Sequence, residues 1–178
     1  MLRGINVSGQ KLIKMKALQQ SYEDLEFQNI TTYLQSGNVI FTSEEVNSKM
    51  LEQRISEQIE TDFGFNVPVI VLTIDKLKQV IDNNPFQKTS DMNQFVYVTF
   101  LYSMPELYNK ESIENKKQGG EEVVFTDNVV FLYCPNGYGK TKLTNNFIET
   151  KLNVEATTRN WKTTNELLNI ALETNKKA

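Results

Sequence analysis

The chain contains no histidine, and this absence excludes more chemistry than any other feature of its composition. Without an imidazole there is no Ser-His or Cys-His nucleophile pair, and the commonest general base near neutral pH is missing. A thiolate zinc site is excluded as well, because Cys134 is the single cysteine. We therefore predict no metal site and no cofactor. Any catalysis would have to depend on Asp, Glu, Lys, Tyr, Ser or Thr.

Long hydrophobic runs are also missing. The longest apolar runs, at residues 67–72 and 95–101, fall far short of the roughly 20 residues that cross a bilayer. No charged start leads into an apolar segment of the kind found in signal peptides. A single cysteine cannot form an internal disulfide, which fits a reducing compartment. These absences predict a cytoplasmic protein that does not contact a membrane, and they leave the oligomeric state open.

The charge of the chain is small and unevenly distributed. The net charge is −3, and the 39% hydrophobic and 23% charged residues are ordinary globular values. Two segments, 1–20 and 137–162, are locally basic. A mildly acidic chain disfavours broad nucleic-acid binding, which depends on an extended basic surface. The two basic segments are compatible with solvated faces, with one anion-binding face or with weak nucleic-acid binding.

The hydrophobic pattern predicts the same series of elements twice. In the first half it predicts a strand, a helix, a hairpin, a helix, a strand and an extra helix, at residues 2–7, 15–25, 29–34 with 39–41, 51–63, 67–72 and 74–81. The second half gives the same order, at residues 94–102, 103–116, 121–125 with 129–133, 140–152, 154–157 and from Thr163 onward. Asn47 or Ser48 is a candidate cap for the helix that ends at Gly64.

This order predicts an α+β fold of two ferredoxin-like β-α-β-β-α-β subdomains in tandem, each followed by an extra helix. The two hairpins also share similar text, SGNVIF at residues 36–41 and TDNVVF at residues 126–131. We place the N-terminal subdomain at residues 1–86 and the C-terminal subdomain at residues 87–178. The polar segment 83–93 has the composition of a linker.

Gly139, Lys140 and Thr141 follow a predicted strand and precede a predicted helix, which is the setting of a phosphate-binding loop. The complete motif requires a glycine where this chain has Cys134, and the bulky Tyr138 lies inside the loop. A nucleoside triphosphatase is therefore not predicted. Lysines at a helix start oppose the helix dipole, so a bound anion would offset their repulsion.

Five segments together resemble the bacterial domain of unknown function 1697 family. They are LRGINV at 2–7, TYLQSGNV at 32–39, NPF at 84–86, PNGYGKTKL at 135–143 and TTRNW at 157–161. The resemblance covers nearly the whole chain and implies an α+β protein of two ferredoxin-like subdomains, with no established activity. The chain departs from the family where Met1 alone precedes Leu2, which implies a truncated first strand, and where Ser8-Gly9 replaces Gly-Gly.

The polar positions of these segments are the candidate ligand-binding residues. Together with Lys140 they are Arg3, Asn6, Gln35, Ser36, Asn38, Lys142, Arg159, Asn160 and Trp161. We predict a binding module for a small anionic ligand in a pocket formed by the LRGIN, YLQSGN, KTKL and TTRNW segments. Arg159 would pair with a carboxylate or phosphate, and Trp161 would offer a stacking face.

Other interpretations of the same residues stay open. Trp161 can be a core anchor, Arg159 can pair with an internal acid, and residues 35–38 can simply form a turn. A histidine-free enzyme acting on an anionic substrate would use Lys142 as an electrostatic clamp and Ser36 or Tyr33 in its chemistry. A weak nucleic-acid-binding protein is the third possibility.

Overall fold

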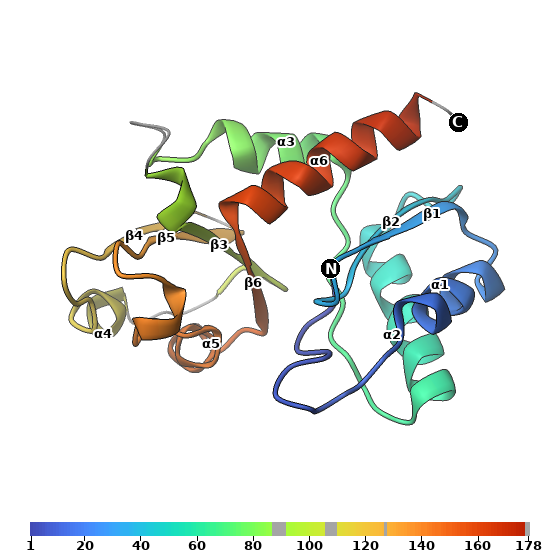
Figure 1. Cartoon of the computed structure of the whole chain (residues 1–178), viewed down its shortest axis with the longest axis horizontal. Helices are drawn as coiled ribbons and strands as arrows, with labels where there is room; N and C mark the ends of the chain where they lie inside the picture. The colour runs from blue at the N-terminus through green and yellow to red at the C-terminus, as the bar shows by residue number, and fades with distance from the viewer. Residues whose placement is uncertain (87–91, 106–109, 127, 177–178) are drawn as a thin grey trace. The chain divides into compact units, whose positions relative to one another are not determined.

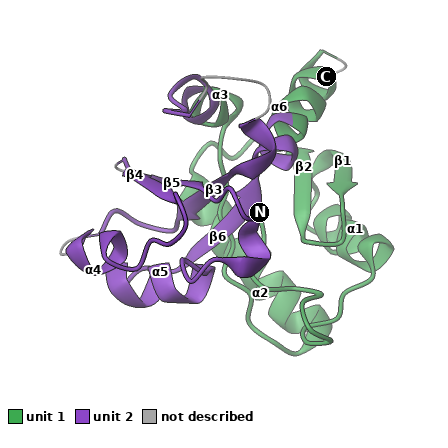
Figure 2. Ribbon diagram, turned by 60° about the vertical axis from the view of Figure 1, so that its left-hand side comes forward, with its two compact units in different colours: residues 1–78, 166–178 green, residues 79–165 purple. Residues whose placement is uncertain are grey.

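The computed structural model describes residues 1–86, 92–105, 110–126 and 128–176 (Figure 1). Within these ranges the chain is a mixed α+β protein with six α-helices and two antiparallel sheets. It divides into two compact units, unit 1 (residues 1–78 and 166–178) and unit 2 (residues 79–165), which Figure 2 colours separately. The predicted boundary falls between residues 86 and 87, and residue 87 lies outside the described ranges, so that boundary stays a prediction.

Unit 1 is built from a hairpin, two helices and parts of two more. Its elements are α1 (Met15–Asp24), β1 (Gln28–Tyr33), β2 (Asn38–Thr42), α2 (Ser48–Phe63), the start of α3 (Ile74–Asp82) and the end of α6 (Trp161–Asn175). The hairpin and the two complete helices confirm the sequence pattern. Asn47 caps α2 by accepting hydrogen bonds from the backbone of Lys49 and Met50, and Gly64 ends it with a φ of 77°.

The predicted strands at 2–7 and 67–72 do not form strands, and this part of the prediction is wrong. The two segments meet at one antiparallel bridge, between Leu2 and Val69. Gly4, Asn6 and Ser8 have positive φ values of 69°, 55° and 50°, so the chain curls where a strand would have to stay extended. The sheet of unit 1 therefore has two strands, β1 and β2.

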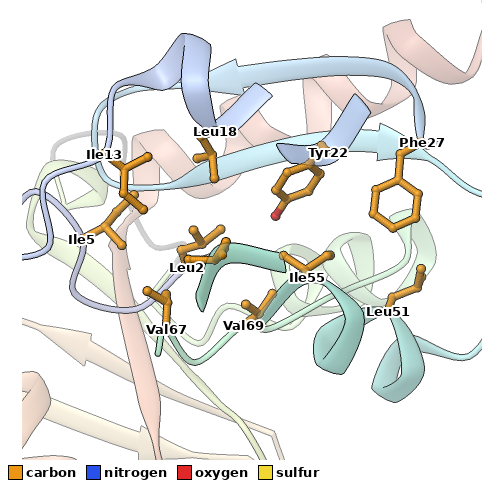
Figure 3. Close-up of a cluster of buried hydrophobic side chains, with 11 residues drawn as sticks. Leu2, Ile5, Ile13, Leu18, Tyr22, Phe27, Leu51, Ile55, Val67 and Val69 are labelled. Carbon is orange, nitrogen blue, oxygen red and sulfur yellow. The ribbon is translucent and has the colours of Figure 1, made fainter. Parts of the chain in front are cut away.

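The core of unit 1 explains why the N-terminal segment packs without forming a strand. Figure 3 shows Leu18 and Tyr22 pointing from α1 toward the layer that contains Leu2 and Ile55. The buried cluster consists of Leu2, Ile5, Ile13, Leu18, Tyr22, Phe27, Leu51, Ile55, Ile59, Val67 and Val69. Each large apolar side chain buried in this way contributes about 1.5–3 kcal/mol. Side-chain burial, rather than sheet pairing, thus fixes the first residues of the chain.

Unit 2 contains the larger sheet. Its elements are β3 (Val96–Leu101), α4 (Lys110–Glu114), β4 (Glu122–Phe125), β5 (Val129–Tyr133), α5 (Asn145–Leu152) and β6 (Ala156–Asn160), with 3-10 turns at Asn93–Phe95 and Tyr138–Lys140. The strand order is β4-β5-β3-β6, and every neighbouring pair is antiparallel. One face packs on α4 and α5 through a cluster that includes Leu101, Ile113, Leu132 and Ile148.

Two predicted helix starts in unit 2 are wrong. The helix predicted to open at Lys140 begins at Asn145, because the Thr144 side chain accepts a hydrogen bond from Phe147 N at 3.2 Å and caps it. The terminal helix begins at Trp161 instead of near Thr163, because Asn160 Oδ1 accepts from Thr163 N at 2.7 Å. The predicted helix 103–116 falls partly outside the described residues, which show α4 alone in that range.

No helix in the described parts of the chain is both long enough and apolar enough to cross a membrane.

Candidate functional site

Asn6 joins two loops of unit 1 that carry predicted site residues. Its Nδ2 donates to Gln35 O at 2.8 Å and to Ile13 O at 3.0 Å, while its Oδ1 accepts from Ile13 N at 2.9 Å. Asparagine tolerates the left-handed conformation that Asn6 adopts, with a φ of 55°. The side chain therefore holds the loop before α1 against the turn between β1 and β2.

The same turn is held from its other side by Asn38 and by the backbone of Gly37. The buried Asn38 side chain donates to Tyr33 O and to Ser36 Oγ, each at 3.0 Å. Leu2 N donates to Gly37 O at 2.8 Å, and Arg3 N donates to Pro68 O at 3.0 Å. The structure thus brings Asn6, Gln35, Ser36 and Asn38 into one hydrogen-bonded group, with internal partners for both asparagines.

We expect Asn6→Ala to lower the free energy of unfolding by about 1–3 kcal/mol, because it leaves backbone groups of Gln35 and Ile13 without their partner. Asn6→Gly is the matched control, since glycine adopts a positive φ readily and removes only the amide. Urea unfolding curves of the full chain measure both. If Asn6→Gly is as stable as the wild-type chain, the amide does not hold these loops together.

Arg159 of unit 2 lies on β6 and is only 8% exposed. Its Nη1 donates to Thr157 Oγ1 at 2.7 Å and to Thr158 O at 3.0 Å. Burial disfavours the charged guanidinium and lowers the pKa of Arg159 from its usual 12.5 to about 10. The side chain is still a cation at neutral pH.

Strand alternation separates Arg159 from the loop that carries the two predicted lysines. Thr158 Oγ1 lies 2.9 Å from both Thr99 Oγ1 and Asn145 Oδ1, so the Thr158 side chain points to the face that packs on α5. Arg159 is the next residue and points to the opposite face. Lys140 and Lys142 are exposed, and their loop packs on the Thr158 side through Tyr138, whose ring lies 4.8 Å from that of Tyr97.

Asn160 and Trp161 occupy the junction between β6 and α6. Asn160 Oδ1 caps the helix, and the Trp161 indole is buried. Because Arg3, Asn6, Gln35, Ser36 and Asn38 belong to unit 1 and the other five predicted residues belong to unit 2, convergence of all ten in one pocket stays a prediction.

Unit 1 contains a pocket of about 340 Å³ that the sequence did not indicate. Its walls come from β2, from residues 70–74, from the first turns of α2 and α3, and from the last turns of α6. The lining includes Val39, Phe41, Leu51, Ile70, Leu72, Leu77, Leu167 and Ala171. Asn38 is a predicted site residue that also lines this pocket.

Tyr22, from α1, also lines this largely apolar pocket. Its side chain is 1% exposed, and no hydrogen bond contributes to the pKa shift of its hydroxyl among the described residues. Burial raises the pKa of Tyr22, so the phenol is protonated at neutral pH and can donate. The sequence predicted a helix at residues 15–25 that includes Tyr22, and that prediction carries no signal for a ligand site.

The charged side chain that lines the pocket is acidic. Glu45 lines the pocket, and no lysine or arginine is found among its described lining residues. Met1 also lines it, and its amino group donates to Ile70 O at 2.7 Å. Val46 stands at this lining with 89% of its surface exposed. The arrangement suits a mostly apolar molecule better than an anion.

Comparisons with known proteins give a family and a fold without an activity. Residues 1–131 match the model of a family described as "Protein of unknown function (DUF1697)". A solved structure, described as that of conserved bacterial protein SP0830 from Streptococcus pneumoniae, is similar with a TM-score of 0.65 and 23% identity. The match covers 96% of each chain. No curated protein matches the sequence.

Proposed function

Because the chain belongs to the DUF1697 family, whose description names no activity, we propose a function from its own geometry: unit 1 is a binding module for a small molecule. The observation that carries this proposal is the pocket of about 340 Å³, which falls within the roughly 300–1,000 Å³ of typical ligand sites. We propose that this module acts in the cytoplasm, since a single buried thiol fits a reducing compartment.

The construction of the pocket supports this function. Its walls combine segments far apart in the chain, from β2 to α6, so the pocket exists only in the folded unit. The walls are mainly aliphatic, with Phe41 and Tyr22 as aromatic members. Apolar walls with a few placed polar groups are the usual composition of small-molecule sites, because burial supplies affinity and the polar groups orient the ligand.

Calorimetric titration of the full chain with a medium-chain methyl ketone tests the proposal. We expect saturable binding of one molecule per chain and a rise in the melting temperature with ligand concentration, since a ligand that binds only the folded state stabilises it. Absence of saturation with this ketone and with the alkane, carboxylate and ammonium of the same chain length, with an unchanged melting temperature, would contradict the proposal.

An anionic ligand at unit 2 is a second candidate, favoured by the exposure of Lys140 and Lys142 on either side of the buried Thr141. If an anion binds at these two lysines, sulfate will raise the melting temperature of the wild-type chain more than that of K140A/K142A. The double variant K14A/K16A is the matched control, because it removes two exposed lysines at the same spacing in unit 1. Equal responses of the two double variants would show that sulfate acts nonspecifically.

We also infer that unit 2 is a ferredoxin-like subdomain and that unit 1 is a reduced copy of it. The order β3-α4-β4-β5-α5-β6, with β3 between β5 and β6 in an antiparallel sheet, supports this interpretation for unit 2. For unit 1 the support is the element order around its hairpin, with the first and last strands of the order reduced to the bridge between Leu2 and Val69.

A further inference from the structure

We infer that the ligand of the unit 1 pocket is an uncharged, largely hydrocarbon molecule with one hydrogen-bond acceptor, which the Tyr22 hydroxyl holds. The inference rests on the proposed function and adds the chemical class of the ligand. Three features carry it: the buried hydroxyl, the charge of the lining side chains and the volume of the pocket.

Tyr22 is fixed in place by its aromatic neighbours. Its ring makes edge contacts with Phe27 and Phe41, at centroid distances of 5.9 and 5.4 Å. Figure 3 shows the hydroxyl directed away from α1 into the core of unit 1. A buried hydroxyl loses its hydrogen bonds to water on folding, so an acceptor on a ligand would recover that loss. The phenol is protonated at neutral pH, and the ligand atom it meets must therefore accept.

The side chains that line the pocket favour an uncharged ligand. A carboxylate in this pocket would face Glu45 and would find no lysine or arginine side chain among the described lining residues. The Met1 amino group, which also lines the pocket, already donates to Ile70 O at 2.7 Å. Removing a charge from water into an apolar pocket is costly unless the charge is paired. A ketone, ester or ether oxygen satisfies Tyr22 without that cost. At roughly 30 Å³ for each small group, the volume holds about ten such groups, which is the size of a medium-chain molecule.

The test compares four probes of equal chain length with the full chain: a medium-chain methyl ketone, the alkane, the carboxylate and the ammonium. We expect the ketone to bind the wild-type protein about tenfold more tightly than the alkane, the usual effect of one hydrogen bond. Tyr22→Phe keeps the ring and should bring the ratio of ketone affinity to alkane affinity close to one. Tyr133→Phe, in unit 2, is the control and should behave like the wild-type chain.

The outcomes separate this inference from the function on which it rests. If the carboxylate or the ammonium binds most tightly, or if Tyr22→Phe keeps the preference for the ketone, the ligand class is wrong although unit 1 is still a binding module. If none of the four probes binds, both the ligand class and the proposed function are overturned.

Discussion

Gly37→Ala is expected to lower the free energy of unfolding by about 2–5 kcal/mol, because the added methyl group brings both backbone strain and overpacking. Gly37 has a φ of 75°, a conformation that costs an L-residue roughly 1–2 kcal/mol. A Cβ there would lie 2.8 Å from Ile5 Cδ1 and 2.8 Å from Leu2 Cβ. Overpacking of a core costs about 1–3 kcal/mol more. The hydrogen bond from Leu2 N to Gly37 O keeps the two segments from moving apart.

Gly9→Ala separates the cost of backbone strain from the cost of overpacking. Gly9 has a φ of 73°, and nothing lies within 4 Å of a Cβ built on it, so alanine there brings the backbone strain without the contact. Urea unfolding of both variants should give a clearly larger loss for Gly37→Ala. Equal losses would show that the close packing of Leu2 and Ile5 against the turn does not depend on Gly37.

Ala171→Phe is expected to weaken binding of the methyl ketone by at least about a hundredfold, equivalent to about 2.7 kcal/mol. Ala171 lines the pocket from α6 and is half-buried. A phenyl ring at this position would occupy space that the ligand needs, and an occupied pocket cannot bury a second apolar group. The measurement is the same calorimetric titration as for the wild-type chain.

Leu172→Phe is the matched control for this effect. Leu172 is the next residue of α6, is 40% exposed and does not line the pocket among the described residues. It adds an aromatic ring to the same helix without entering the cavity, so affinity should stay near the wild-type value. A loss in both variants would indicate a general disturbance of α6, and full affinity in Ala171→Phe would place the ligand elsewhere.

Local rules predicted the elements that local interactions determine. The hairpin of β1 and β2 follows from β-branched residues around a Gly-Asn turn, and α2 follows from its apolar stripe between Asn47 and Gly64. The prediction of a strand from Leu2 was wrong because the residues of this segment have a strand's composition. Gly4 and Asn6 adopt left-handed conformations that the packed core selects. The predicted start of α6 was wrong because Asn160 and Thr163 are both good caps, and Asn160 caps the helix.

The candidate site was less predictable than the fold. Asn6, Asn38 and Asn160 were selected as polar signature residues, and the structure gives each of them an internal hydrogen bond. The pocket combines β2, residues 70–74 and the end of α6, and no spacing along the chain brings such segments together. Tyr22 could not be distinguished from a core residue, because it also belongs to the buried apolar cluster of unit 1.

The most direct test of the account is an isotope-edited nuclear Overhauser experiment on the full chain saturated with the methyl ketone. The account predicts contacts between the hydrocarbon chain of the ligand and the methyl groups of Val39, Val71 and Leu167, which all line the pocket. It also predicts contacts between the Tyr22 ring and the protons next to the ketone carbonyl. Contacts with residues of unit 2 alone, or no contacts at saturating ketone, would contradict it.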